Sequence, residues 1–389
     1  MCYFMISVEF LKVVKFMKNK DVYKIVSISD IHMGVLDPLY MYTELRRQFV
    51  DRLINLDFDI LAICGDIFDS RFMSNNPIIS YTIQLVNDIV NLCASRNATL
   101  IIIDGTHSHD NGQLSLFYHY MQNPNIDVRI VERIQFEQVK GLNILCIPER
   151  YGIPEEEYNK VLFESGRYDI CLMHGTFKGS FKGSEIATLK SNHAPVFSMN
   201  SFRNCAGVIL MGHYHVPGCY EQYAYYNGSP LRFRFGEEQE KGFLVTLYNP
   251  YKRAHYTELI PIDSYIYNTI NIDHLINSDP KDIIAHIKRI KEEQGIDFIR
   301  VQFNNANENM NIVKNYFRNS NNVKLQELYK KDKQMQEIDK TILEQNVQYS
   351  YILDNDISDY DKFVMYINQN EGYDFISSDE LIKLLEGDL

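Results

Sequence analysis

The chain has 389 residues, of which 45% are hydrophobic and 23% are charged, a composition typical of a globular protein with two or three domains. Its formal net charge of −12 argues against an autonomous, strongly basic nucleic-acid-binding protein, but it does not exclude a nuclease, because metal ions can supply local positive charge. The seven cysteines include no Cys-x-x-Cys pair, which predicts reduced thiols in a cytoplasmic protein.

Residues 1–22 form an extension that is apolar and basic. It lacks a small-residue cleavage site, and Glu9 and Lys12 interrupt its apolar part. We therefore expect a short amphipathic helix, or an upstream start before a natural beginning at Met17, rather than a signal peptide. No stretch of the chain reaches the ~18–20 apolar residues of a membrane span.

Short apolar runs typical of buried strands recur in the first 211 residues. They lie at 23–29, 59–64, 99–103, 142–148, 169–173 and 207–211. Between the early runs, apolar residues recur at helical spacing over 45–56 and 83–93. Strands that alternate with helices predict a layered α/β fold.

The pattern changes near residue 260. Alternating strands are followed by a helix over 280–294, a strand over 297–303 and a helix over about 308–318, which predicts a small α+β unit. After residue 322 the sequence is charged and predicted to be helical. The predicted parts are thus an extension (1–22), a main domain (23–260), a small α+β domain (261–322) and a helical tail (323–389).

Acids and histidines follow the predicted strands directly. They are Asp30, His32, Asp66, the group His107–Asp110, His174, His213 and His215. Ligands gather at the carboxyl ends of strands in open α/β sheets, so five segments are expected to deliver these side chains to one edge. Oxygen and imidazole ligands suit Mn²⁺, Fe or Zn²⁺. Each motif alone fits a helix cap or a surface histidine, but the whole set predicts a dinuclear metal centre.

The order of these motifs is D-x-H, G-D-x-x-D, a His-Asp loop, an isolated His and G-H-x-H. It resembles the calcineurin-like metallophosphoesterase superfamily. The stretches "DIHMG" and "GDIFDS", and the segment 226–248, resemble the double-strand-break-repair nuclease family, in the SbcD branch and its phage relatives. The resemblance covers about residues 22–320. It implies an α/β fold, a layered metallophosphoesterase β-sandwich flanked by helices, with a small α+β capping domain and a helical C-terminal tail.

The resemblance also implies two bound Mn²⁺ ions, or other divalent transition metal ions. The ligands of the first ion would be Asp30, His32, Asp66 and His215. Those of the second would include Asp66, His174 and His213, so that Asp66 bridges the two ions.

The loop "IDGTHSHDNG" at 103–112 departs from the family's Gly-Asn-His-Asp, in which the Asn carbonyl completes the second metal site and the His acts near the leaving oxygen. Counted from the strand, Thr106 replaces the Asn and His107 is catalytic. Counted back from the His-Asp pair, Ser108 replaces the Asn and His109 is catalytic. We favour the second register, because an acidic neighbour can orient an imidazole and raise its pKa. In both registers a hydroxyl replaces an amide, so a looser second metal is expected.

The resemblance implies a Mn²⁺-dependent DNA exonuclease and endonuclease in the cytoplasm of a bacterium or a phage-infected host. It would act in DNA repair and recombination as a homodimer with an SMC-like ATPase of the SbcC type, which the helical tail would bind. Two alternatives stay open. One is a metallophosphodiesterase or phosphatase for small substrates, and the other is a non-catalytic DNA-end scaffold in which the altered loop marks a degenerate site.

Overall fold

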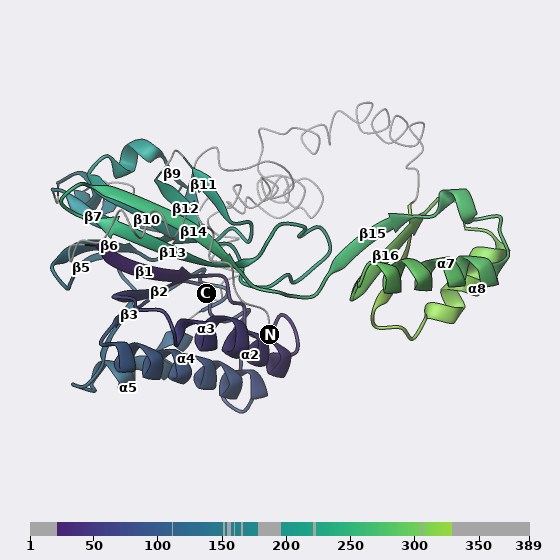
Figure 1. Ribbon diagram of the computed structural model, residues 1–389, viewed down its shortest axis with the longest axis horizontal. Coiled ribbons are helices and arrows are strands. Elements are labelled where there is room, and N and C mark those ends of the chain that lie inside the picture. The colour runs from purple at the N-terminus through teal and green to yellow at the C-terminus, as the bar shows by residue number, and fades with distance from the viewer. Residues whose placement is uncertain are drawn as a thin grey trace, which may run out of the picture. The chain divides into compact units, whose positions relative to one another are not determined.

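The computed structural model describes residues 22–328, apart from 111, 151, 154–156, 159, 165, 178–195, 221–222 and 305 (Figure 1). The predicted N-terminal helix, and the predicted tail from residue 329 on, lie outside the described residues. Within the described part no helix is long and apolar enough to cross a bilayer. Its cysteines, Cys64 to Cys219, are free thiols, as predicted.

The first of two six-stranded sheets has the order β14-β13-β1-β2-β3-β4. Its strands are β1 (Tyr23–Ile28), β2 (Ile60–Cys64), β3 (Thr99–Ile103), β4 (Asp127–Val131), β13 (Gly242–Asn249) and β14 (Ala254–Pro261). Strands β1 to β4 run parallel to one another, whereas β13 runs antiparallel to both of its neighbours, β1 and β14. The carboxyl ends of β1, β2 and β3 therefore meet at one edge of the sheet.

The second six-stranded sheet has the order β11-β12-β10-β7-β6-β5. Its strands are β5 (Gln135–Val139), β6 (Leu142–Ile147), β7 (Tyr168–His174), β10 (Cys205–Gly212), β11 (Gly218–Tyr220) and β12 (Ala224–Tyr226). Strands β6, β7 and β10 are parallel neighbours, so their carboxyl ends also lie together.

Helices cover one face of the first sheet (Figure 1). They are α2 (Pro38–Leu45), α3 (Asp51–Leu53), α4 (Pro77–Arg96) and α5 (Tyr118–Met121), with a π-helical turn at Arg46–Val50 and a 3-10 turn at Gln113–Phe117. Helix α4 has clear end signals: the Asn76 side chain accepts a hydrogen bond from the Ile78 N–H at its start, and Asn97 adopts the left-handed conformation at its end.

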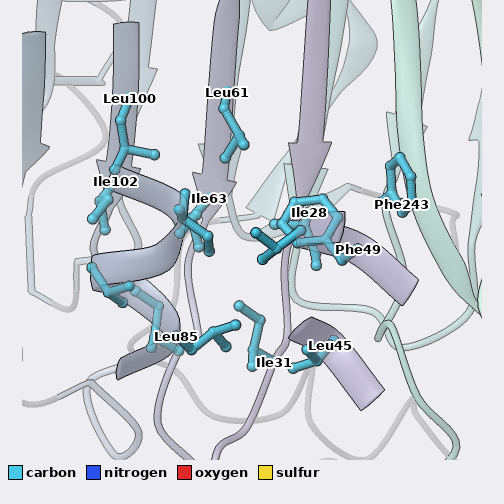
Figure 2. Close-up of a cluster of buried hydrophobic side chains, with 14 of the residues drawn as sticks. Ile28, Ile31, Leu45, Phe49, Leu61, Ile63, Leu85, Leu100, Ile102 and Phe243 are labelled. Atoms are coloured by element: carbon cyan, nitrogen blue, oxygen red, sulfur yellow. The ribbon is translucent and has the colours of Figure 1, made fainter. Parts of the chain in front are cut away.

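Three apolar clusters hold these layers together. Figure 2 shows the cluster between the first sheet and the helices, where Ile28 of β1 lies beside Phe49. Successive strand residues point to opposite faces. For this reason Ile25 joins the second cluster, which fills the space between the two sheets.

The third cluster involves the face of the second sheet that points away from the first. Residues of a π-helical turn (Lys160–Glu164), a 3-10 turn (Met199–Phe202) and the two-stranded sheet of β8 (Thr176–Phe177) and β9 (Val196–Phe197) contribute to it. The predicted α/β sandwich of sheets flanked by helices is confirmed.

The later elements are β15 (Tyr267–Asn271), a 3-10 turn (Asp273–Leu275), α7 (Pro280–Glu293), β16 (Phe298–Phe303), α8 (Glu308–Phe317) and β17 (Val323–Glu327). They confirm the predicted strand and helix positions after residue 260. The predicted helical start at residue 323 is wrong. Val323–Glu327 pairs as a strand in a sheet of order β15-β16-β17, and buried Val323 is followed by exposed Lys324, which suits a strand.

The described residues fall into two compact units. One holds those up to Thr269 together with Ile287–Arg300, and the other holds Ile270–His286 and those from Val301 on. The domain boundaries predicted at residues 23 and 261 remain predictions.

Candidate metal centre

Six strand ends, three from each six-stranded sheet, deliver polar side chains to one place. These residues are Asp30 after β1, Asp66 after β2, Thr106 after β3, Glu149 after β6, His174 at the end of β7 and His213 after β10. His32 and His215 follow two residues beyond Asp30 and His213. The site therefore depends on both sheets of the sandwich.

The loops that carry these residues have unusual backbone conformations. Asp30, Asp66 and His213 have φ angles of 51°, 53° and 109°, a region that costs a non-glycine residue about 1–3 kcal/mol. Two hydrogen bonds hold the loops after β1 and β2 together, from Asp30 N–H to Gly65 O (3.1 Å) and from His32 N–H to Asp66 O (3.0 Å). Such strain, held in place by its surroundings, is typical of a functional site.

Gly105 allows the third loop to approach Asp66. A Cβ atom on Gly105 would lie 2.2 Å from Asp66 Oδ1, so only glycine fits at this position.

The first group of possible ligands contains Asp30, His32 and His215. Their donor atoms all lie within 4.8 Å of one another, and the Nε2 atoms of the two imidazoles are 3.0 Å apart. Burial lowers the pKa of His32 to about 3, because it disfavours the charged ring. The neutral imidazole that results is the form that binds a cation.

The second group of possible ligands contains His174, His213 and Glu149, and Asp66 lies beside it. His174 is its most buried histidine. Its Nε2 lies 3.3 Å from Asp66 Oδ2, while its Nδ1 lies 2.7 Å from the Cys64 carbonyl oxygen and donates to it. This bond directs Nε2 at the acidic cluster. Burial alone would lower the pKa of His174, but the carboxylates of Asp66, Asp30 and Glu149 raise it well above its ordinary value. A cation between these groups would replace that proton.

Glu149 belongs to the second group, although the sequence analysis missed it. Its Oε2 lies 3.1 Å from His213 Nδ1 and 3.2 Å from Thr106 Oγ1. Burial would raise its pKa, but the hydrogen bond and charge of His213, with the charge of His174, lower it. A signal was present in the sequence: Glu149 follows its strand by two residues, the same offset that Asp30 and Asp66 have.

The loop after β3 places Thr106 in the second group. The Thr106 N–H donates to Asp66 Oδ1 (2.7 Å), and its hydroxyl lies 3.2 Å from His174 Nε2. Ser108, the predicted ligand, and His107 are both exposed.

His109 lies beside the first group. Its ring centroid is 4.6 Å from that of His32 in an edge-to-face arrangement, and its Nδ1 is hydrogen-bonded to the Asp69 carbonyl oxygen. The loop thus brings together Thr106 of one predicted register and His109 of the other.

Asp110 holds the loops after β2 and β3 in position. Its buried carboxylate accepts hydrogen bonds of 2.9–3.1 Å from the backbone N–H groups of Asp66, Ile67, Phe68 and Gly105. Each loop is thereby tied to the other through one side chain.

The centre is open on one side. The side chains of His213 and His215 are 18% and 25% exposed, whereas those of Asp66 and His174 are nearly inaccessible. A substrate can therefore approach from the side of the two histidines.

Among the described residues, the buried atoms His32 Nδ1 and Glu149 Oε1 have no hydrogen-bond partner. Together with the carboxylate and imidazole donors, this fits a divalent transition metal ion.

A family model described as calcineurin-like phosphoesterase matches residues 23–217, about half of the chain. The chain belongs to the calcineurin-like phosphoesterase family. Family membership confirms the predicted superfamily and implies phosphoester hydrolysis with divalent metal ions. The matched residues contain all the strand ends described above.

Two curated proteins resemble this phosphoesterase. One is the putative phosphoesterase 244L of Invertebrate iridescent virus 6, at 21% identity over 262 residues, which are 64% of this chain and 85% of the viral protein. The other is the SbcD component of the nuclease SbcCD from Staphylococcus epidermidis, at 24% identity over 251 residues. That match covers 57% of this chain and 65% of the staphylococcal protein, slightly less than two thirds of its length.

One solved structure, a mutant cold-active protein tyrosine phosphatase, aligns at 13% identity with a TM-score of 0.26 over 60% of this chain and 80% of that one.

Proposed function

We propose that this phosphoesterase is a Mn²⁺-dependent DNA nuclease subunit that works with an SMC-like ATPase of the SbcC type. The observation that carries the proposal is the convergence of carboxylates and imidazoles from both sheets into two adjoining groups. Asp66 Oδ2 lies near both, 3.6 Å from His32 Nε2 and 3.3 Å from His174 Nε2. The proposed ligands are Asp30, His32, Asp66 and His215 for one ion, and Asp66, His174 and His213 for the other. Thr106, rather than the exposed Ser108, is the hydroxyl that would face the second ion.

Divalent ions bound at these groups would supply Lewis acidity to a phosphodiester and lower the pKa of water. The chain's own residues set the geometry. His174 is fixed by the Cys64 carbonyl, and the left-handed backbone of Asp30 and Asp66 aims their carboxylates at the imidazoles. His109 is the proposed proton donor to the leaving oxygen. Its Nδ1 is held by the Asp69 carbonyl, so its Nε2 is the atom that can transfer the proton.

The segment that resembles the SbcD branch supports the finer assignment, because it contacts the metal centre. Lys241 Nζ donates to the His215 carbonyl oxygen at 2.6 Å, and Glu237 Oε1 lies 3.6 Å from His215 Nδ1. A matching nuclease component among the relatives points the same way. A partner ATPase and a second copy of the chain would add DNA-binding surface to a chain whose net charge is −12.

The deciding experiment measures cleavage of linear duplex, hairpin and single-stranded DNA in Mn²⁺, beside a chromogenic phosphodiester. We expect DNA cleavage that a chelator abolishes. Asp66→Asn should lose at least about 99% of turnover, since losing a shared ligand costs several kcal/mol at the transition state. Hydrolysis of the chromogenic ester with no cleavage of any DNA would instead favour a small-substrate phosphodiesterase.

A further inference from the structure

Glu149 has a buried carboxylate to which the proposed ligand set assigns no role. Its side chain is 1% exposed, and its Oε1 atom has no hydrogen-bond partner among the described residues. Burying a carboxylate costs several kcal/mol unless its oxygens are paired or bind a cation. A cation beside Glu149 would remove that cost.

The neighbouring donor atoms show where that cation would lie. Glu149 Oε2 is 3.1 Å from His213 Nδ1 and 3.7 Å from His174 Nε2, and the three donor atoms fall within 4.8 Å of one another. The Cys64 carbonyl holds Nδ1 of His174, so Nε2 faces the same space as the carboxylate. If Glu149 only oriented His213, it would need its contact with His213 Nδ1 but not its approach to His174 Nε2.

Thr106 explains why a carboxylate is needed there. Its hydroxyl lies 3.2 Å from Glu149 Oε2 and 3.3 Å from Asp66 Oδ2, in the place where the resemblance to the nuclease family predicts an amide. A hydroxyl is a shorter and weaker ligand than an amide carbonyl. Because Thr106 brings a hydroxyl to this place instead of an amide, another strand end would have to supply an additional oxygen.

We propose that Glu149 is a direct ligand of the second metal ion and takes the place of the missing amide, an inference that rests on the proposed function. The other ligands of that ion would be Asp66, His174 and His213. Three carboxylates would then face two divalent ions and leave one net positive charge, where an amide would leave two. A more negative set of ligands binds a cation more tightly. The smaller net positive charge that remains attracts the substrate phosphate less strongly.

Mn²⁺ binding to the full chain tests this, measured by calorimetry and by metal analysis after equilibrium dialysis. Wild-type protein should bind two ions. Glu149→Ala should weaken binding of the second ion by about 100-fold or more, since even indirect partners of a metal ligand are worth about 10–100-fold. The isosteric Glu149→Gln keeps a carbonyl oxygen that can bind the ion, so it should weaken binding less than Glu149→Ala does. The double variant Thr106→Asn, Glu149→Ala should regain the second ion, because the amide can enter the space that the glutamate leaves.

Asp104→Asn is the matched control. Asp104 is another buried carboxylate at a strand end, but it pairs with Arg150 at 3.1 Å and lies outside the ligand groups, so this variant should keep both ions. Two ions bound by Glu149→Ala with wild-type affinity would overturn the inference. Failure of the double variant to regain the second ion would overturn it too, since an orienting role predicts that result.

The same measurements separate this inference from the proposed function. If wild-type protein binds two ions and Glu149→Ala binds one, but only small esters are hydrolysed, the nuclease proposal fails and the ligand assignment stands. If wild-type protein binds no Mn²⁺, both are overturned.

Discussion

Three residues of the loop after β3 make different contacts at the site, although they are close in sequence. Thr106 faces the second ligand group, His109 lies beside His32, and Asp110 ties the loop to the backbone after β2. The two residues between Thr106 and His109 project outward, since His107 and Ser108 are exposed. The loop therefore accommodates two extra residues without displacing either functional side chain.

This arrangement predicts a clear contrast between two neighbouring histidines. His109→Ala should lower the rate of the chemical step by about 10²–10⁴-fold while Mn²⁺ stoichiometry stays unchanged, because general acid help is worth that much. His107→Ala should change the rate by less than about threefold. Single-turnover cleavage, with bound metal measured in parallel, tests both variants. An inactive His107→Ala with an active His109→Ala would return the catalytic role to the other register.

At the scale of residues, the histidines of the site could be predicted from the sequence more completely than its oxygen ligands. His32, His174, His213 and His215 all reach the predicted groups, because a histidine just beyond an apolar strand is rare enough to stand out. Glu149 and Thr106 are common residue types in loops. The offset of Glu149 from its strand was visible in the sequence, but only the packed structure shows that Glu149 and Thr106 face the same space.

At the scale of elements, apolar strands were easier to predict from the sequence than strands that mix charged and apolar residues. The strands β1, β2, β3, β6, β7 and β10 are mostly apolar and buried, as expected for strands covered on both faces. Strands β4 and β5 were not predicted, since Asp127–Val131 and Gln135–Val139 mix charged and apolar residues. Such sequences become strands through pairing with neighbours, a tertiary effect that local propensity does not contain.

The segment between β12 and β13 contains a buried ionic network that supports the site. Lys241 Nζ contacts Glu237 Oε2 at 3.1 Å and Ser229 Oγ at 2.9 Å, and both charged residues are almost fully buried. Burial would raise the pKa of Glu237, but contacts with His215, Lys241 and the Phe233 N–H lower it to about 2.

This shift gives a pH-dependent contribution to stability. Because the pKa of Glu237 is lower in the folded chain than its ordinary 4.5, its contribution is present above pH 4.5 and is lost as the pH falls to about 2. Glu237→Gln should lower the free energy of unfolding by about 3 kcal/mol at pH 7, and this difference should shrink below pH 4.5. Denaturant unfolding from pH 3 to 7 tests this, with the exposed neighbour Glu238→Gln as control. A difference that is constant with pH would contradict it.

At the scale of the whole molecule, the phosphoesterase centre lies within residues 30–215, far before the C-terminal segment. Strand β17 extends to Glu327, so a truncation has to follow Leu328 to leave the three-stranded sheet intact. This moves the start of the proposed partner-binding segment a few residues beyond the predicted boundary at 323.

Removal of the residues after Leu328 should leave catalysis intact but abolish binding of the partner ATPase. We expect the truncated chain to keep Mn²⁺-dependent hydrolysis of a chromogenic phosphodiester within about threefold and to lose its association with an SbcC-type ATPase. Co-expression followed by affinity purification measures the association. Recovery of the ATPase with the truncated chain would show that the partner binds elsewhere.

Each of the two proposed ions would take ligands from both sheets, the first from Asp30 and His215 and the second from Asp66 and His174. Unfolded chain offers no such arrangement, so metal binding and folding are thermodynamically linked. Each site would add about 2.7 kcal/mol to the free energy of unfolding when free metal stands a hundredfold above its dissociation constant. Without ions, buried carboxylates of like charge repel one another across the sandwich. The supply of divalent ions would thus set how long the folded chain survives, as well as how fast it works.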